Sequence, residues 1–186
     1  MRLIQETKSI LQTNFKIKDL GELKFFLGIE FARSSEGIFL MHQRKYALEL
    51  ISDLGLGGTK LVGAPVEVNQ KFTSIVFDQH VHSQHDPVLN DPGPYQRLVG
   101  RLLYLTVTRA DISFAIQNLS QFMHSTKQSH MEAATRVVKY IKQAPGVGIL
   151  MSSTVSSKLQ AYCDVDWGSC LTTRKSVSGY AVKIAD

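Results

Sequence analysis

The fold is decided by residues 95–142, which read YQRLVGRLLYLTVTRADISFAIQNLSQFMHSTKQSHMEAATRVVKYIK. Leucine, isoleucine, valine and phenylalanine recur in this stretch every three or four positions, which is the spacing of a helix that buries one face. The pattern predicts two consecutive helices, over residues 95–106 and 112–122. We therefore expect a helical core in this part of the chain.

A third helix is predicted to follow them. Ser129 and Glu132 have the spacing of a capping box, in which the two side chains bind amide groups that lack partners at a helix start. The helix should begin there and run to about Gln143. Pro145 and Gly146 should end it, because neither residue favours a helix interior.

Upstream, the pattern predicts a helix, a β-hairpin and another helix. Residues 2–14 place apolar side chains at helical spacing. Between residues 23 and 41, aromatic and β-branched residues stand on both sides of the turn-forming sequence at 34–37, which is typical of a hairpin. Residues 43–54 return to the helical period, and Gly55 is placed to end that helix.

Residues 57–94 have the composition of a loop. They contain four of the five prolines and many Gly, Ser, Asn and Asp residues, so we expect a long linker. His80, His82 and His85 lie close together in it and could bind a metal ion. The stretch has no helical or strand periodicity, however, and a solvated loop is the preferred interpretation.

After Gly148 the period changes to two, which predicts strands over residues 148–151, 159–165 and 178–184. In the middle strand Asp164 and Asp166 share one face, and paired carboxylates on a strand can hold a divalent metal ion against a phosphodiester. The alternative is a solvent-facing strand edge, because a two-metal site usually needs about three or four carboxylates.

The helix predicted at 95–106 offers a second candidate surface. Gln96, Gly100, Arg101 and Tyr104 lie on or near one of its faces. A glycine inside a helix costs about 1 kcal/mol relative to alanine, so it often marks close approach by another backbone. Arginine and an aromatic ring beside it suit the backbone and sugars of a nucleic acid. Helix packing across Gly100 is the alternative, and composition leaves both open.

Composition and charge narrow the classes of protein. The chain has 186 residues, of which 44% are hydrophobic and 20% are charged, so it is globular. It carries 21 basic and 16 acidic residues, and the net charge of +5 favours a polyanionic partner such as nucleic acid. No apolar run approaches the roughly 18 residues of a membrane-spanning helix, and the first residues do not form a signal peptide. We expect an intracellular protein without a membrane segment.

Other chemistry finds little support in the sequence. Cys163 and Cys170 are the two cysteines, and we expect both to be reduced because no second pair completes a zinc set. A nucleophile elbow and a phosphate-binding loop motif are both absent from the sequence. Nucleophilic hydrolases and nucleotide hydrolases are therefore disfavoured.

Four strings together resemble a known family. In order and spacing they are similar to the Pol polyprotein of copia-type long-terminal-repeat retrotransposons, from the back of the reverse transcriptase into the start of its ribonuclease H domain. The strings are FKIKDLGELKFFLGIEF, GIFLMHQRKYALELISDLGL, the stretch quoted above, and LQAYCDVDWGSCLTTRKSVSGY.

The resemblance implies an α+β chain in four parts. Residues 1–56 resemble the end of the palm, with a primer-grip-like hairpin and the helix after it. Residues 57–94 are a linker, and residues 95–146 resemble a helical thumb. Residues 147–186 resemble the truncated start of a ribonuclease H-like domain.

The resemblance also assigns roles to residues. In the family the thumb helix follows the minor groove of the primer–template duplex, which makes Gln96, Gly100, Arg101 and Tyr104 the nucleic-acid-binding positions. Asp164 stands at the first metal-binding aspartate of ribonuclease H, with Asp166 beside it, and Mg²⁺ is the metal that the family implies.

The family's activity is RNA-directed DNA polymerisation, with hydrolysis of RNA in hybrids. The sequence departs from this pattern, because it contains no Tyr-x-Asp-Asp string and lacks the remaining ribonuclease H acids. Ala110 also replaces the proline of the family's Thr-Arg-Pro-Asp-Ile string. We expect an inactive fragment, without a cofactor of its own, that retains at most binding of an RNA/DNA hybrid or duplex DNA and belongs with the rest of a Pol polyprotein. The alternative is a degenerate transposon remnant with no biochemical role.

Overall fold

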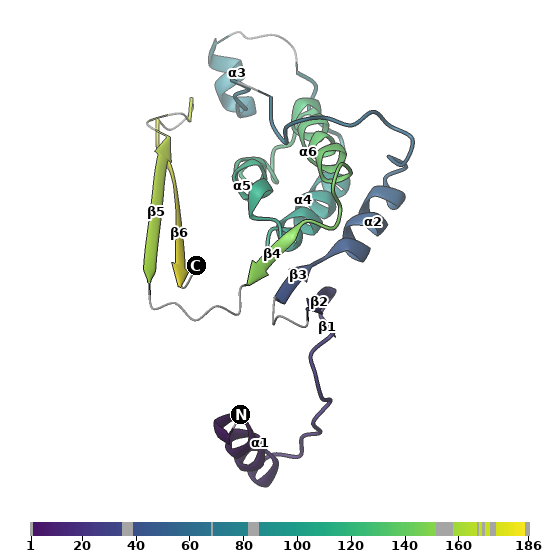
Figure 1. Cartoon of the computed structure of the whole chain (residues 1–186). Helices are drawn as coiled ribbons and strands as arrows, with labels where there is room; N and C mark the ends of the chain where they lie inside the picture. The colour runs from purple at the N-terminus through teal and green to yellow at the C-terminus, as the bar shows by residue number, and fades with distance from the viewer. Residues whose placement is uncertain are drawn as a thin grey trace.

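The computed structural model describes residues 2–34, 39–67, 69–81, 86–151, 158–166, 168, 170–171 and 174–184. The architecture is α+β, as expected: a helical core lies beside a small antiparallel sheet, while the first helix and a two-stranded hairpin extend away from it (Figure 1). In chain order the elements are α1 (Arg2–Asn14), β1 (Phe25–Phe26), β2 (Ile29–Arg33), β3 (Phe39–His42), α2 (Arg44–Asp53), α3 (Ile75–Val81), α4 (Gly93–Leu105), the 3-10 turn η1 (Ala110–Ile112), α5 (Ser113–Ser120), α6 (Gln128–Ile141), β4 (Gly148–Met151), β5 (Leu159–Asp166) and β6 (Val177–Ile184).

The core consists of the apolar faces of α2, α4, α5 and α6. Tyr95 is the largest fully buried side chain, and its hydroxyl donates a 2.7 Å hydrogen bond to the carbonyl of Leu119, so its polar end is satisfied inside the core. The helices predicted from the stretch 95–142 are confirmed. The first of them begins two residues early, at Gly93, because Pro94 stands in its first turn, where a missing amide hydrogen costs nothing.

The start of α6 differs from the prediction. The capping residue is Lys127, whose backbone amide donates to Nδ1 of His130 at 3.2 Å. Ser129 lies inside the helix, and its hydroxyl donates to Oδ2 of Asp86 at 2.6 Å. The predicted capping box of Ser129 and Glu132 is therefore wrong, because a carboxylate from a distant part of the chain binds Ser129 instead.

The sheet has the strand order β1-β2-β3-β4 and is antiparallel throughout. The predicted hairpin is confirmed in β2 and β3, which pair Phe31 with Met41. The resemblance places residues 147–151 in the fourth part of the chain, the ribonuclease H-like start, but β4 pairs with β3 of the first part instead. Gly148 permits this pairing, because a Cβ atom there would lie 2.0 Å from the carbonyl oxygen of Met41.

We call the described residues 57–67, 69–81 and 86–92, which lie between α2 and α4, the strap, because several of them pack against the helical core. The stretch predicted as a linker contains α3, and its Phe72 and Leu89 pack against the core. Lys142 of the helix end donates to the carbonyl of Thr59 at 2.6 Å. The prolines and glycines that suggested a loop form the turns of a packed segment.

A buried ion cluster attaches the strap to α6. The Lys127 side chain is 3% exposed, and its Nζ lies 2.5 Å from Oδ2 of Asp78 and 3.3 Å from Oδ2 of Asp86. Nζ also donates to the hydroxyl of Thr73 at 2.9 Å. Burial acts to raise the pKa of Asp86, but hydrogen bonds from Ser129 and Lys127 outweigh it and hold that pKa below its usual value.

Strands β5 and β6 form a separate two-stranded sheet, which confirms the last two predicted strands. Their described apolar side chains are exposed, and α1, the helix predicted at 2–14, has no buried residue. Of the three clustered histidines, His82 and His85 lie outside the described residues. None of the described helices combines the length and the apolar character that a bilayer crossing requires.

Candidate nucleic-acid interface

Tyr104 joins the first core helix to the tip of a hairpin. Its hydroxyl donates to the carbonyl of Leu27, which lies in the two-residue turn between β1 and β2. Leu27 (φ 48) and Gly28 (φ 75) both adopt left-handed backbone conformations, as a type I′ turn requires. Since leucine is strained there, the bond from Tyr104 helps to hold this turn against α4.

Arg101 connects α4 to α2 on the same side. Its guanidinium donates to Oδ2 of Asp53 at 2.8 Å and lies 5.6 Å from the centre of the Tyr46 ring. Tyr46 in turn packs edge-on against Tyr104, with the ring centres 5.3 Å apart. The Arg101 side chain keeps 32% of its surface exposed. Its charge is therefore positioned by the fold and still reaches solvent.

Gly100 lies beside Arg101 in an open part of the surface. It is exposed, and a Cβ atom added to it would meet no atom within 4 Å. The alternative of helix packing across Gly100 is wrong for the described residues of this chain. Arg97, one turn earlier on α4, is also exposed.

Gln96 does not join this group. Its Nε2 donates to the carbonyl of Met123 at 2.9 Å, and the side chain is partly buried between α4 and the segment after α5. The structure thus brings Gly100, Arg101 and Tyr104 together on one surface, and turns Gln96 toward a structural contact. We call these three residues and the turn at Leu27 the α4 surface.

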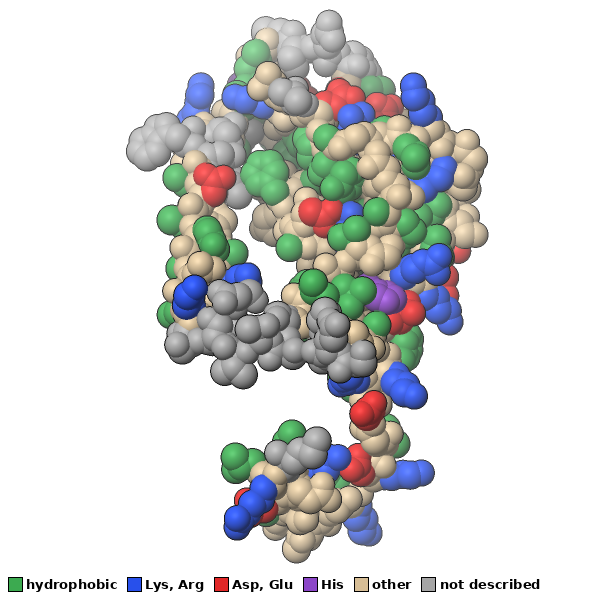
Figure 2. Space-filling model, viewed as in Figure 1, with side chains coloured by type: hydrophobic (Ala, Val, Ile, Leu, Met, Phe, Trp, Pro, Cys, Tyr) green, Lys and Arg blue, Asp and Glu red, His purple; other side chains and the backbone are tan. Residues whose placement is uncertain are grey.

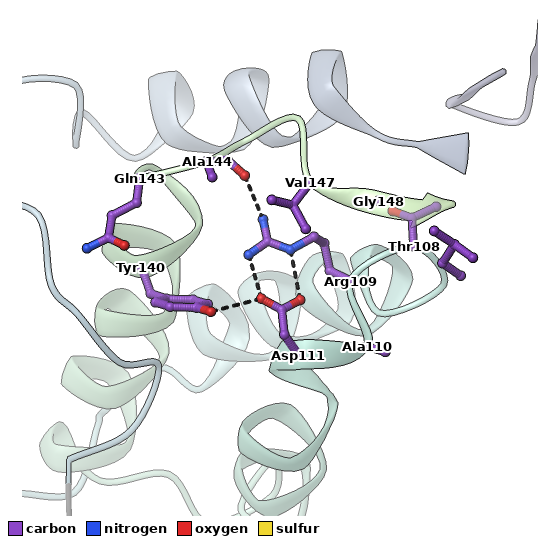
Figure 3. Close-up of a pocket in the computed structure, with 10 residues that line it drawn as sticks. Thr108, Arg109, Ala110, Asp111, Tyr140, Gln143, Ala144, Val147 and Gly148 are labelled. Atoms are coloured by element: carbon purple, nitrogen blue, oxygen red, sulfur yellow. Dashed lines mark hydrogen bonds and ion pairs between the residues drawn. The ribbon is translucent and has the colours of Figure 1, made fainter. Parts of the chain in front are cut away.

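A second polar group, not identified from the sequence, lines a cavity of about 310 Å³ beside β4 (Figure 3). Arg109 is nearly buried and donates to both carboxylate oxygens of Asp111, at 2.8 and 2.7 Å. It also donates to the carbonyl of Ala144 at 3.0 Å, and the Tyr140 hydroxyl donates to Asp111 at 3.0 Å. The hydrogen bonds from Arg109 lower the pKa of Asp111, while the carboxylate raises the pKa of Tyr140.

We call Arg109, Asp111 and Tyr140 the Arg109 joint, because their hydrogen bonds connect separate elements of the fold. The Arg109–Asp111 pair ties η1 to the connection between α6 and β4, because Ala144 lies in that connection. Because the Arg109 side chain is buried and its charge is paired with Asp111, we assign this group no ligand. Ala110, which replaces the family's proline, begins η1 without disturbing the pair. The spacing of an arginine and an aspartate two residues apart, between two helices, was the signal available in the sequence.

The carboxylates of β5 lie apart from both groups. Asp164 is exposed, pairs with Gly179 of β6, and accepts a 2.9 Å hydrogen bond from the amide of Val165. The side chain of Asp166 lies outside the described part of the structure. In the ranges that the structure describes, no three His, Cys, Asp or Glu side chains gather into a metal-binding cluster. Asp164 alone does not make up a magnesium site.

Comparison with known proteins identifies the family. Residues 1–68 match the model of the family described as reverse transcriptase (RNA-dependent DNA polymerase). The chain is 35% identical over 180 residues to the retrovirus-related Pol polyprotein from transposon RE2 of Arabidopsis thaliana, a match that covers 97% of this chain and 12% of that protein. The chain belongs to the Pol polyproteins of copia-type retrotransposons. We refer to it as the Pol segment.

Other relatives agree with this assignment. The Pol segment is 32% identical over 170 residues to the uncharacterized mitochondrial protein AtMg00810 of Arabidopsis thaliana, covering 91% of the segment and 66% of that protein. It is 27% identical over 180 residues to the retrovirus-related Pol polyprotein from transposon TNT 1-94 of Nicotiana tabacum, covering 96% of the segment and 13% of that protein. It therefore spans about an eighth of the transposon polyproteins that it matches. No solved structure matches it significantly.

Proposed function

We propose that the Pol segment binds a nucleic-acid duplex, an RNA/DNA hybrid or duplex DNA, through the α4 surface. In the whole polyprotein this contact would hold the primer–template for RNA-directed DNA polymerisation. The names of its relatives and the family matched by residues 1–68 support a role in reverse transcription.

Gly100 is the observation that carries the proposal. A glycine in an exposed helix interior costs about 1 kcal/mol relative to alanine. No contact with another described residue accounts for it, because a Cβ atom added to Gly100 would meet no atom of theirs within 4 Å. The absence of a side chain there lets another molecule approach the helix backbone, between a positioned arginine and a tyrosine.

The charge of the surrounding surface supports a polyanionic ligand. Arg97 and Arg101 lie one turn apart on α4, and Arg44 and Lys45 begin the neighbouring helix α2. Asp53 and Glu49 of α2 pair with Arg101 and Lys45, which leaves Arg97 and Arg44 in excess. Figure 2 shows Lys and Arg side chains spaced along the right-hand edge of the molecule, on the side where Figure 1 draws α2. Phosphate contacts from such side chains position a duplex without reading its sequence.

We also propose that Asp164 supplies one ligand of a Mg²⁺ site. A carboxylate oxygen is the type of ligand that Mg²⁺ prefers, and Asp164 is exposed on β5. Further ligands would have to come from outside the described residues. Asp166 is the nearest candidate in sequence.

The binding proposal is tested by fluorescence anisotropy of a labelled RNA/DNA hybrid at several salt concentrations. We expect binding that weakens steeply as salt rises. Contacts to phosphates release counterions from the nucleic acid, and this release favours binding less at high salt concentration. Gly100→Ala should weaken binding about tenfold because a methyl group would stand between helix and duplex. The same substitution should stabilise the fold by about 1 kcal/mol, because alanine favours the helix.

Gly58→Ala is the matched control, since a Cβ atom at Gly58 also enters open space but the residue lies outside α4, in the strap. It should leave hybrid binding unchanged. Equal affinity of the Gly100→Ala variant and the unmodified chain would refute close approach at α4. Absence of binding even at low salt would favour the degenerate remnant without a biochemical role.

A further inference from the structure

A smaller cavity, of about 160 Å³, lies between the strap and α5. It shares no lining residue with the α4 surface or with the Arg109 joint. Its walls combine aromatic rings with side-chain amides, and this combination of side chains points to a particular class of ligand.

The α5 wall presents an aromatic ring between polar groups. Phe114 is 52% exposed, so a ligand can reach its ring. Asn118 follows one helical turn later and Gln121 comes directly after the helix, so all three share one face. A flat ligand stacked on Phe114 would therefore meet two amide groups that can both donate and accept hydrogen bonds.

The strap wall holds a polar atom that lacks a partner. Oε1 of Gln70 is buried, and it has no hydrogen-bond donor among the residues that the structure describes. A buried acceptor without a donor costs free energy, so a ligand whose amino group reached Gln70 would remove that cost. Gln70 and its neighbour Asn69 both line the cavity.

The base of the cavity is a rigid stack of rings. Phe72 meets Phe122 edge-on with ring centres 6.3 Å apart, and Phe122 stacks on the buried His130 at 4.2 Å. Because His130 is held by the amide of Lys127, this stack is anchored in the start of α6. Phe72 and Phe122 are thus supported by the core, and Cys170, from the connection between β5 and β6, also lines the cavity.

We propose that this cavity binds an unpaired nucleobase that carries an exocyclic amino group. A base supplies a flat ring for Phe114, and asparagine and glutamine amides match the donor and acceptor edge of adenine. The exocyclic amino group would donate to Gln70. Lys71, exposed at the rim, would meet the attached phosphate.

The proposal is independent of duplex binding by α4. A single strand stacks its bases on aromatic side chains, whereas a duplex buries its bases and offers only its grooves and backbone. The base that enters the cavity could belong to a single strand or to a free nucleotide, since both offer the same ring and amino group. The experiment distinguishes these two ligands.

The experiment measures anisotropy of fluorescein-labelled DNA octamers made of adenine, of thymine or of abasic residues. The abasic octamer keeps the phosphates and loses the bases. We expect the adenine octamer to bind most tightly, since thymine lacks an exocyclic amino group. Competition by adenosine monophosphate would show that a free nucleotide also enters the cavity, and its failure to compete would assign the site to a strand.

Phe114→Ala should weaken binding of the adenine octamer about tenfold, the effect of losing one stacked base. The matched control is Phe15→Ala, because Phe15 is equally exposed but lies at the end of α1. Neither variant should change binding of the RNA/DNA hybrid, so failure of this proposal is distinguishable from failure of the α4 proposal. Equal affinity for adenine and abasic octamers, or a Phe114→Ala variant that binds like the unmodified chain, would overturn it.

Discussion

Acidification should destabilise the Pol segment through one buried side chain, His130. The imidazole is fully buried, accepts a hydrogen bond at Nδ1 from the amide of Lys127, and stacks on Phe122. Burial, and secondly the charge of Lys127, lower the pKa of His130 from 6.5 to about 4, while Asp86 and Asp78 act in the opposite direction. In the folded protein the ring is therefore neutral at physiological pH.

The sign and size of the effect follow from the two pKa values. Because the pKa of His130 is lower in the folded state, the unfolded chain binds more protons between pH 6.5 and 4, and stability falls as the pH falls through that range. The full difference corresponds to about 3 kcal/mol, of which about 2.5 kcal/mol should be lost between about pH 7 and pH 4.5. Above pH 7 the contribution is fully present.

Urea unfolding at a series of pH values measures this loss directly. His130→Gln is the informative variant, because glutamine at this third helical position can still accept the hydrogen bond from the Lys127 amide but does not titrate. The variant should be less stable at pH 7, since it loses the stacking on Phe122. Its stability should change little between pH 7 and pH 4.5. If its stability falls as steeply as that of the unmodified chain, another group is responsible and the reasoning is refuted.

Three other substitutions test contacts between elements of the fold, the first two by the same unfolding measurement and the third by hydrogen exchange. Lys127→Met should destabilise the chain by about 3–5 kcal/mol, because it leaves two partly buried carboxylates without their cation; a change below about 1 kcal/mol would contradict the ion cluster. Asp111→Asn should cost a similar amount, of about 3 kcal/mol, since Arg109 would keep a buried charge without a counter-ion, and an unchanged midpoint would contradict the joint. Gly148→Ala should remove hydrogen-exchange protection from β4, because its methyl group would overlap the Met41 carbonyl; protection equal to that of the unmodified chain would exclude this pairing.

The regular elements could be predicted because their signals are local. The helical period placed α1, α2, α4, α5 and α6, and the alternation placed β2 to β6 within a few residues. The strap was missed because its contacts depend on partners far along the chain. Asp78 and Asp86 show no pattern of their own, and only the fold brings Lys127 between them.

Helical spacing also predicted most residues of the α4 surface, but not which of them make contacts inside the fold. Helical spacing placed Gly100, Arg101 and Tyr104 on one face, and the structure keeps them together. The same spacing also included Gln96, whose amide instead binds the Met123 carbonyl, an acceptor supplied by another element. Such competition between partners does not appear in a periodic pattern.

The pairing of β3 with β4 has a consequence for the order of folding. Residues 43–147, which include all of the helical core, lie between two strands that are hydrogen-bonded neighbours. Closing a chain loop of that length costs on the order of 4 kcal/mol of entropy before any contact is gained. The four residue pairs between β3 and β4 cannot offset this free energy alone. We therefore expect β4 to pair with β3 only after the helices have brought the two ends of the loop close together. β4 would then join the sheet late in folding, and the helical core should form even in molecules in which β4 is not yet paired.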